Sequence, residues 1–179
     1  MNTLYVVRHG KTNWNKMGAV QGITDVELNE DGINDAIKLS KTINLDEIDI
    51  CISSPLKRAK KTAEIITNNK INVICDDLLI ERCFGDYEAS KASYDFLAKC
   101  WNYKLNYSSN DVEPIRDCLN RAKVFLDKIK REYPDKNILI VSHGAFIKAI
   151  HFNIVGYDEN TDFLSFKPQN TTLYKYILK

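Results

Sequence analysis

The chain of 179 residues lacks several features that mark common classes of protein. Its 25 lysines and arginines nearly balance 24 aspartates and glutamates, so no general positive charge draws it to nucleic acid or to an anionic membrane surface. No apolar run approaches the about twenty residues of a transmembrane helix. The N-terminus enters an expected strand almost at once, without the pattern of a signal peptide. We therefore expect neither nucleic acid nor a membrane as a partner.

Cysteine and histidine are too few, and too irregularly spaced, for a metal or disulfide framework. The five cysteines are an odd number with no C-x-x-C pair, which favours reduced core thiols in the cytoplasm. The three histidines lack metal-ligand spacing, so we expect no metal and no cofactor. The P-loop pattern G-x-x-x-x-G-K-[ST] is missing, and no cysteine is followed by arginine six positions later. The loops of P-loop nucleotide-binding proteins and of cysteine phosphatases are therefore excluded.

Two of the three histidines end a short phrase that occurs near both ends of the chain. Leu4–Gly10 and Ile138–Gly144 each consist of four apolar residues, one polar residue, histidine and glycine. A continuous apolar run of this length predicts a strand that is buried on both faces. His9 and His143 would then follow the carboxyl ends of central strands, where ligands bind in open α/β sheets. The repeat indicates an enzyme whose site uses both imidazole rings.

Strand and helix patterns alternate along the rest of the chain. Strands are expected at 3–8, 48–53, 71–75, 137–142 and 172–178, with a further strand near 163–166. Helical periodicity is expected over 30–43, 55–68 and 114–132, and in a shorter helix after Gly144. Asn29 is the expected N-cap of the first helix, and Ser54 and Pro55 the expected cap and first residue of the second. The alternation predicts one α/β domain over residues 1–179 with a mostly parallel sheet.

Residues 86–111 fit this alternation least well because they are rich in aromatic side chains. One interpretation is a helix that packs its rings on the core. The other is a cap over the carboxyl ends of the strands, where the rings would line a substrate pocket. Both interpretations stay open, and each can hold for different rings.

Charged residues near the expected strand ends suggest a site for phosphate. Arg8 ends a buried strand, where a charge is costly unless a partner such as a bound anion is present. Arg58 lies at the start of a helix, where the dipole disfavours a cation, so a phosphate there would gain from the guanidinium and from free backbone N–H groups. Glu81 follows the third strand in the mostly apolar stretch 78–84 and is either a paired structural carboxylate or a proton donor.

These residues together predict a reaction at phosphorus. His9 would attack the phosphorus atom and become a phosphohistidine, which splits one difficult step into two easier ones. Arg8, Arg58 and a protonated His143 would hold the phosphoryl oxygens. Glu81 would protonate the departing alkoxide and then help deprotonate the water that attacks the phosphohistidine.

The motifs of the chain, taken in order, resemble those of the histidine phosphatase superfamily, the phosphoglycerate-mutase-like enzymes. The stretches that carry the resemblance are Arg8–Asn15 (R-H-G-x-T-x-W-N), Gln21-Gly22 (Q-G), Asp25–Gly32 (D-x-P-L-T-x-x-G), Ser53–Ala59 (S-S-P-L-x-R-A), Glu81–Glu88 (E-x-x-F-G-x-W-E) and Ser142–Gly144 (S-H-G). The chain departs from the pattern at Ala19, Tyr87 and Ala89, on the expected wall of the pocket. The resemblance therefore points to the chemistry and leaves the substrate open.

The resemblance implies a three-layer α/β/α sandwich with a mostly parallel mixed sheet. It implies that His9 is the nucleophile and Glu81 the proton donor, and that the reaction needs no metal. The phosphate-binding residues would be Arg8, Asn15, Arg58 and His143, and Gln21 and Gly22 would lie near the substrate.

The expected function is that of a metal-independent phosphomonoesterase acting on a small soluble phosphate ester through a phosphohistidine. One alternative is a cofactor-dependent phosphoglycerate mutase, although such enzymes are longer, with segments that close over the site. The other is a non-catalytic phospho-ligand binding domain, whose sign would be the loss of His9 or Glu81, and both are present. The oligomeric state is left open.

Overall fold

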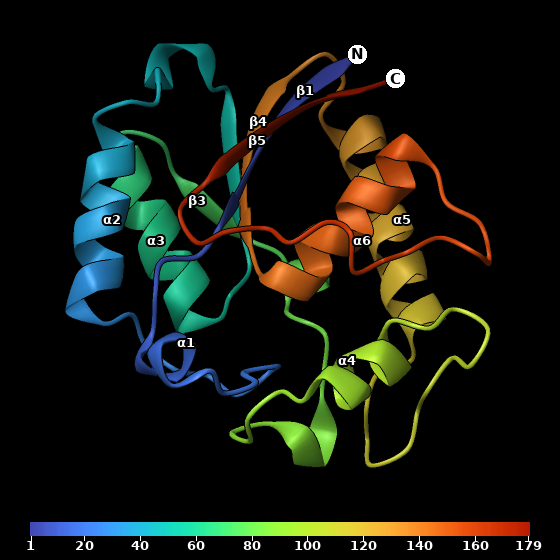
Figure 1. The fold of residues 1–179 in the computed structure, drawn as a ribbon. Coiled ribbons are helices and arrows are strands. Elements are labelled where there is room, and N and C mark those ends of the chain that lie inside the picture. The colour runs from blue at the N-terminus through green and yellow to red at the C-terminus, as the bar shows by residue number, and fades with distance from the viewer.

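A computed structural model describes residues 1–179 and places a five-stranded sheet between two layers of helices (Figure 1). The strands are β1 (Asn2–Arg8), β2 (Ile50–Ser53), β3 (Val73–Cys75), β4 (Asn137–Ser142) and β5 (Leu173–Leu178). Their order in the sheet is β3-β2-β4-β1-β5. All neighbouring strands are parallel except β5, which pairs antiparallel with β1. The predicted α/β/α sandwich with a mostly parallel mixed sheet is confirmed.

Helices cover both faces of the sheet (Figure 1). They are α1 (Asn13–Met17), α2 (Glu30–Ser40), α3 (Lys57–Thr67), α4 (Tyr94–Cys100), α5 (Ile115–Glu132) and α6 (Gly144–Val155), with short 3-10 helices at Leu45–Glu47, Asp77–Leu79 and Gly85–Tyr87. None of the helices combines the length and the apolar character that crossing a bilayer requires. The layers α2–α3 and α5–α6 lie on opposite sides of the sheet, so both of its faces are buried.

The alternation of side chains along β1 explains why this strand is apolar at every position from 4 to 7. Tyr5 and Val7 pack in the cluster on the α3 side of the sheet, whereas Leu4 and Val6 pack in the cluster on the side of α5 and α6. A strand buried on both faces needs a continuous apolar run rather than an alternating one. The same reasoning applies to β4, the other strand that carries the repeated phrase.

The register between β1 and β4 brings the two histidines together. Val7 pairs with Val141 and Arg8 with Ser142, so the next residues, His9 and His143, leave the sheet side by side. The backbone N–H of His9 donates to the carbonyl of Ser142 at 2.9 Å, which continues the pairing by one residue. The parallel pairing of the two repeated phrases therefore places both histidines at the same edge of the sheet.

The predicted start of the second helix is wrong. Helix α3 begins at Lys57, and its N-cap is Leu56, which makes no side-chain capping bond. The Oγ of Ser54 is instead 2.8 Å from Nε2 of His143, besides accepting the N–H of Leu56 at 3.3 Å. By contrast, Asn29 caps α2 as predicted, because its Oδ1 accepts the N–H of Gly32 at 2.8 Å.

The strand expected near 163–166 is also absent, because the chain turns there. The side chain of Asp162 accepts the N–H of Leu164 at 2.9 Å, and Ser165 Oγ donates to the carbonyl of Asp162 at 2.6 Å. Aspartate and serine compete with sheet pairing through such local bonds. Phe163 is buried by aromatic contacts with Tyr103 and Phe152 rather than by a strand.

The aromatic segment 86–111 contains helix α4 and packs across the carboxyl end of the sheet (Figure 1). Phe96 and Trp101 are each 7% exposed and belong to the core, and Tyr87 stacks on Phe96 with 4.1 Å between ring centroids. Phe96 and Trp101 also line a cavity described below. Tyr94 is exposed. Core packing and pocket lining are thus combined in the same rings.

Candidate active site

A cavity of about 400 Å³ opens where β1 and β4 end. Six of the eight predicted site residues line it: Arg8, His9, Asn15, Gln21, Gly22 and Glu81. The other two, Arg58 and His143, have no exposed surface. The ring centroid of His143 lies 5.1 Å from that of His9. Because His143 is fully buried, its ring lies behind the cavity wall that His9 helps to form.

His9 has the geometry of a nucleophile with one reactive nitrogen. Its Nδ1 lies 2.7 Å from the carbonyl oxygen of Gly10. Because a carbonyl only accepts, Nδ1 carries the hydrogen, and Nε2 keeps its lone pair. Burial lowers the pKa of His9 well below its usual value, and the charges of Arg8 and Arg58 add to this effect. The ring is therefore neutral at pH 7.

The loops around His9 fix the position of its backbone. Asn170 donates from Nδ2 to the carbonyl of His9 at 2.7 Å, and Thr62 Oγ1 accepts the N–H of Gly10 at 2.9 Å. A Cβ on Gly10 would lie 2.6 Å from the carbonyl oxygen of Gly32, so only glycine fits after His9. The glycine of the first repeated phrase thus allows the turn to pass close to helix α2.

His143 is neutral in this structure for the same physical reason as His9. Burial is the largest cause that lowers the pKa of His143 well below its usual value, and the charge of Arg58 and the neighbouring His9 lower it further. Its Nε2 pairs with Ser54, whereas its buried Nδ1 has no hydrogen-bond partner. A ligand with negative charge would favour the protonated ring, because an opposite charge stabilises the charged form.

Two guanidinium groups lie at the site without a carboxylate partner, that of Arg58 buried and that of Arg8 half-buried at the cavity wall. Arg8 donates to the carbonyl of Pro168 at 2.9 Å, and Arg58 donates to the carbonyls of Thr24 at 2.8 Å and Gly22 at 2.7 Å. The Nε atoms of both arginines are buried and unpaired. Burial is the main cause that lowers the pKa of each guanidinium. Buried cations that bond only to carbonyls are suited to an added anion.

Asn15 and Gln21 lie on one hydrogen-bonded network beside the cavity. Oδ1 of Asn15 accepts the N–H of Thr12 at 3.1 Å, and the hydroxyl of Thr12 donates to Oε1 of Gln21 at 3.0 Å. The carbonyl of Asn15 is therefore used to cap helix α1, whereas its amide NH₂ remains available. Gly22 has φ of +53°, and a Cβ there would collide with the carboxylate of Glu88, so this turn requires glycine.

Glu81 reaches the cavity while capping the first turn of α6. Its Oε2 accepts the N–H of Ala145 at 3.0 Å, and its Oε1 accepts the N–H groups of Phe146 at 3.0 Å and Arg82 at 2.8 Å. A carboxylate at a helix N-terminus gains from these donors and from the helix dipole. The structural and the catalytic interpretations of Glu81 are therefore compatible, because the same side chain is anchored and 8% exposed.

The family model of the histidine phosphatase superfamily (branch 1) matches residues 4–179. The chain belongs to this superfamily. The predicted family is confirmed, and with it the class of phosphoric monoester hydrolases.

Named relatives and solved structures agree with this assignment. The chain is 36% identical over 159 residues to an uncharacterized phosphatase PhoE of Bacillus subtilis, covering 88% of this chain and 80% of the relative. It is 30% identical over 169 residues to phosphoserine phosphatase 1 of Hydrogenobacter thermophilus, covering 88% and 78%. A phosphoserine phosphatase of Entamoeba histolytica, solved with 3-phosphoglyceric acid, superposes with a TM-score of 0.81 at 31% identity, covering 99% and 91%.

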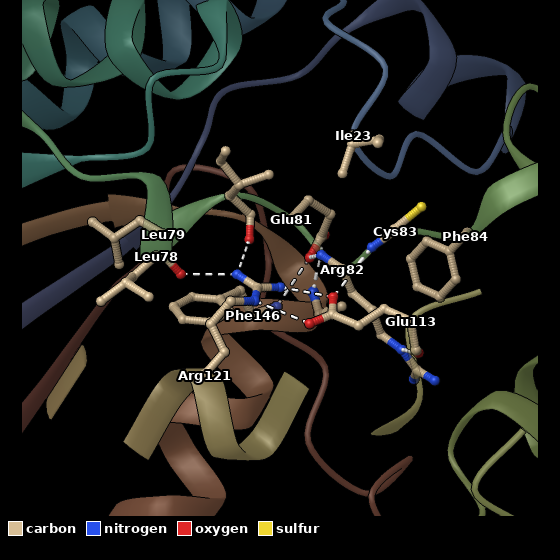
Figure 2. Close-up of polar contacts among 12 residues, drawn as sticks. Ile23, Leu78, Leu79, Glu81, Arg82, Cys83, Phe84, Glu113, Arg121 and Phe146 are labelled. Carbon is tan, nitrogen blue, oxygen red and sulfur yellow. Dashed lines mark hydrogen bonds and ion pairs between the residues drawn. The ribbon is translucent and has the colours of Figure 1, made fainter. Parts of the chain in front are cut away.

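In this histidine phosphatase, a partly buried ion pair holds the loop that carries Glu81 (Figure 2). Arg121 on α5 donates from Nη1 to the carbonyls of Leu78 at 2.8 Å and Ile80 at 2.7 Å. It also binds both carboxylate oxygens of Glu113, at 3.0 and 2.8 Å. Glu113 in turn accepts the N–H of Cys83 at 3.3 Å, so the pair anchors the loop on both sides of Glu81. Sequence reasoning missed Arg121, because nothing local in an amphipathic helix marks its partners.

Replacing Arg121 by methionine is expected to lower the free energy of unfolding by about 3 kcal/mol, because it leaves Glu113 and two carbonyls without their donor. Arg131→Met on the same helix is the matched control. Arg131 is mostly exposed and pairs only with Glu132, so its loss is expected to cost less than about 0.5 kcal/mol. Urea unfolding measures both values, and equal costs would contradict the anchoring role of Arg121.

Sequence reasoning also missed two lysines of the cavity, Lys148 and Lys167, whereas Trp101 belongs to the aromatic segment that was expected to pack on the core or line a pocket. A signal was available for Lys148, because it is the only charged residue among the twelve of helix α6. The motifs of the resemblance do not include Lys148 and Lys167, so the place of these two lysines in the cavity had to come from the structure.

Proposed function

We propose that the chain hydrolyses small phosphate monoesters through a phosphohistidine on His9 and without a metal ion. The observation that carries the proposal is a neutral, buried imidazole with a free Nε2, placed among two guanidinium groups that lack carboxylate partners. A phosphate dianion would supply the missing partner for both cations. Its phosphorus would then face the nucleophile.

In the first step, Nε2 of His9 attacks phosphorus and the bond to the ester oxygen breaks. Glu81 gives its proton to the departing alkoxide, which leaves as a neutral alcohol. In the second step, Glu81 takes a proton from water while the water oxygen attacks the phosphohistidine. Inorganic phosphate leaves, and His9 and Glu81 return to their starting states.

The other predicted residues have supporting roles in this proposal. Arg8 holds the phosphoryl oxygens from the wall of the cavity, and the charges of Arg58 and a protonated His143 behind that wall offset the negative charge that develops on them. The free amide NH₂ of Asn15 donates a further hydrogen bond. Gln21 and Gly22 lie beside the alcohol part of the substrate, and segment 86–111 covers that side of the cavity.

The names of the relatives support a phosphatase acting on small esters. Several are phosphoserine phosphatases, one of them called metal-independent, from Arabidopsis thaliana. A bisphosphoglycerate-dependent phosphoglycerate mutase of Cytophaga hutchinsonii is 29% identical, so the mutase alternative is tested directly. Incubation with 3-phosphoglycerate and a trace of bisphosphoglycerate is expected to release phosphate. Rapid formation of 2-phosphoglycerate without free phosphate would instead identify a mutase.

Activity is expected to survive removal of metal ions, because the cationic groups of the site are side chains. The measurement is phosphate release from p-nitrophenyl phosphate before and after dialysis against EDTA, with the two rates expected to agree within error. A loss of activity that only added metal restores would contradict the mechanism. We also propose a cytoplasmic location, supported by five cysteines that are all unpaired.

A further inference from the structure

Lys148 is a buried cation that the proposed mechanism does not use. Its side chain comes from helix α6, one turn beyond Gly144, and lines the same cavity as His9 and Glu81. Only 6% of the residue is exposed. Its ammonium group lies 4.1 Å from the ring centroid of Trp101 and makes no hydrogen bond or salt bridge with the protein.

The surroundings of Lys148 do not neutralise its charge. Burial is the largest cause that lowers its pKa to about 8, and repulsion from Lys167 and Arg82 acts in the same direction. Glu81 and Asp162 attract the ammonium from a distance, but neither forms an ion pair with it. The contact with Trp101 offsets only part of the cost of removing a lysine from water.

A lysine kept only for packing would behave differently. Long cationic side chains normally bury their carbon stems and extend the charged group into water. Lys175 shows this behaviour elsewhere in the molecule, since it is exposed while its ammonium lies 5.0 Å from the ring centroid of Tyr5. In contrast, the charge of Lys148 is enclosed and directed at the cavity, where a ligand can reach it.

We propose that Lys148, with Lys167 at the rim, binds a carboxylate carried by the alcohol part of the substrate. This inference rests on the proposed function, which places the phosphate beside His9 and Arg8 in the same cavity. A single carboxylate fits better than a second phosphate, because Phe96 and Trp101 form an apolar wall there and a dianion would be costly to desolvate. The substrate class is therefore a small phosphorylated hydroxy acid.

The test compares pairs of esters that differ only in the carboxylate. 3-Phosphoglycerate is paired with glycerol 3-phosphate, and phosphoserine with phosphoethanolamine. Lys148→Met is expected to lower kcat/KM for the two carboxylates by about 10- to 100-fold, the range for losing one charge-assisted hydrogen bond. For the two partners without a carboxylate, the change is expected to be less than about threefold. Lys175→Met, the matched control, is expected to leave all four values unchanged.

Equal losses on both members of each pair, or no loss on either, would overturn the carboxylate site. Lys148→Arg covers the case in which the methionine variant does not fold, because it keeps a charge at this position. The preference of the natural protein for 3-phosphoglycerate is expected to fall between about pH 7 and pH 9, as the ammonium loses its proton. The preference of the arginine variant is expected to stay constant, since its charge persists, and parallel pH profiles would contradict the inference.

Binding separates this inference from the proposed function. Calorimetric affinity for 3-phosphoglycerate and for glycerol 3-phosphate is measured with the natural protein and with Lys148→Met. A protein that hydrolyses no ester, p-nitrophenyl phosphate included, but prefers the carboxylate through Lys148 would overturn the function and retain the site. A protein that hydrolyses p-nitrophenyl phosphate but binds both members of the pair equally would overturn only the site.

Discussion

Replacing His9 by asparagine is expected to abolish turnover and to remove the acid-labile phosphoenzyme. The loss of a covalent nucleophile lowers kcat on the order of 10⁶-fold in other enzymes. The reason is that the remaining groups can still bind the substrate, but no side chain is left to attack it. Asparagine is close in size, and its NH₂ can keep the hydrogen bond to the carbonyl of Gly10, so the turn after β1 is preserved. The measurement combines steady-state phosphate release with acid-labile labelling of the protein by a phosphoryl donor.

His151→Asn is the matched control for this experiment. His151 stacks on Phe166, with ring centroids 4.0 Å apart, and its Nδ1 pairs with the hydroxyl of Tyr176 at 3.0 Å. It does not line the cavity, so its replacement is expected to leave turnover and phosphoenzyme formation unchanged. A phosphoenzyme that persists in His9→Asn would remove His9 as the nucleophile. His9 would also be excluded as the nucleophile if the phosphoryl label were lost in His151→Asn and kept in His9→Asn.

The parts of this fold that could be predicted are those that depend on a pattern of neighbouring residues in the sequence. Two apolar runs that each end in histidine and glycine predicted β1, β4 and the edge they share. The N-cap at Asn29 could be predicted because a short polar side chain directly before a helical pattern commonly caps the first backbone N–H groups of the helix. Arg58 and Glu81 were expected near the same edge because each follows a predicted strand, and the family motifs then gave them their roles, although residues 49 and 72 positions from His9 have no local signal that they meet it.

The parts that could not be predicted depend on partners distant in sequence. Ser54 looked like a helix cap, but its hydroxyl is held by His143, 89 residues later in the chain. The turn at 163–166 is mostly apolar, as a short strand would be, and the local hydrogen bonds of Asp162 and Ser165 form a turn there instead. Arg121 lies on a helix whose pattern is explained by packing alone, so its polar contacts required coordinates, and the lone charge of Lys148 on α6 did not show that it faces the cavity.

Replacing Glu81 by glutamine is expected to slow alkyl phosphates far more than p-nitrophenyl phosphate. General acid catalysis contributes about 10²- to 10⁴-fold, and the full loss is expected for an alkoxide leaving group. Nitrophenolate is stable without a proton, so its kcat/KM is expected to fall much less. This quantity reports the first irreversible step, transfer of the phosphoryl group to His9, and so excludes the later role of Glu81 toward water.

The hydrogen bonds that anchor Glu81 allow the comparison of the two substrates to separate the loss of a proton donor from a change in structure. Glutamine can keep its oxygen toward the N–H groups of Phe146 and Arg82, while its NH₂ faces the N–H of Ala145 and loses that one bond. The cost, about 1 to 3 kcal/mol of stability, is measured by urea unfolding and leaves the site assembled. Because such a structural change acts on both substrates alike, only the difference between them reports the proton. Equal losses of kcat/KM would mean that Glu81 is the cap of α6 and that another group protonates the alcohol.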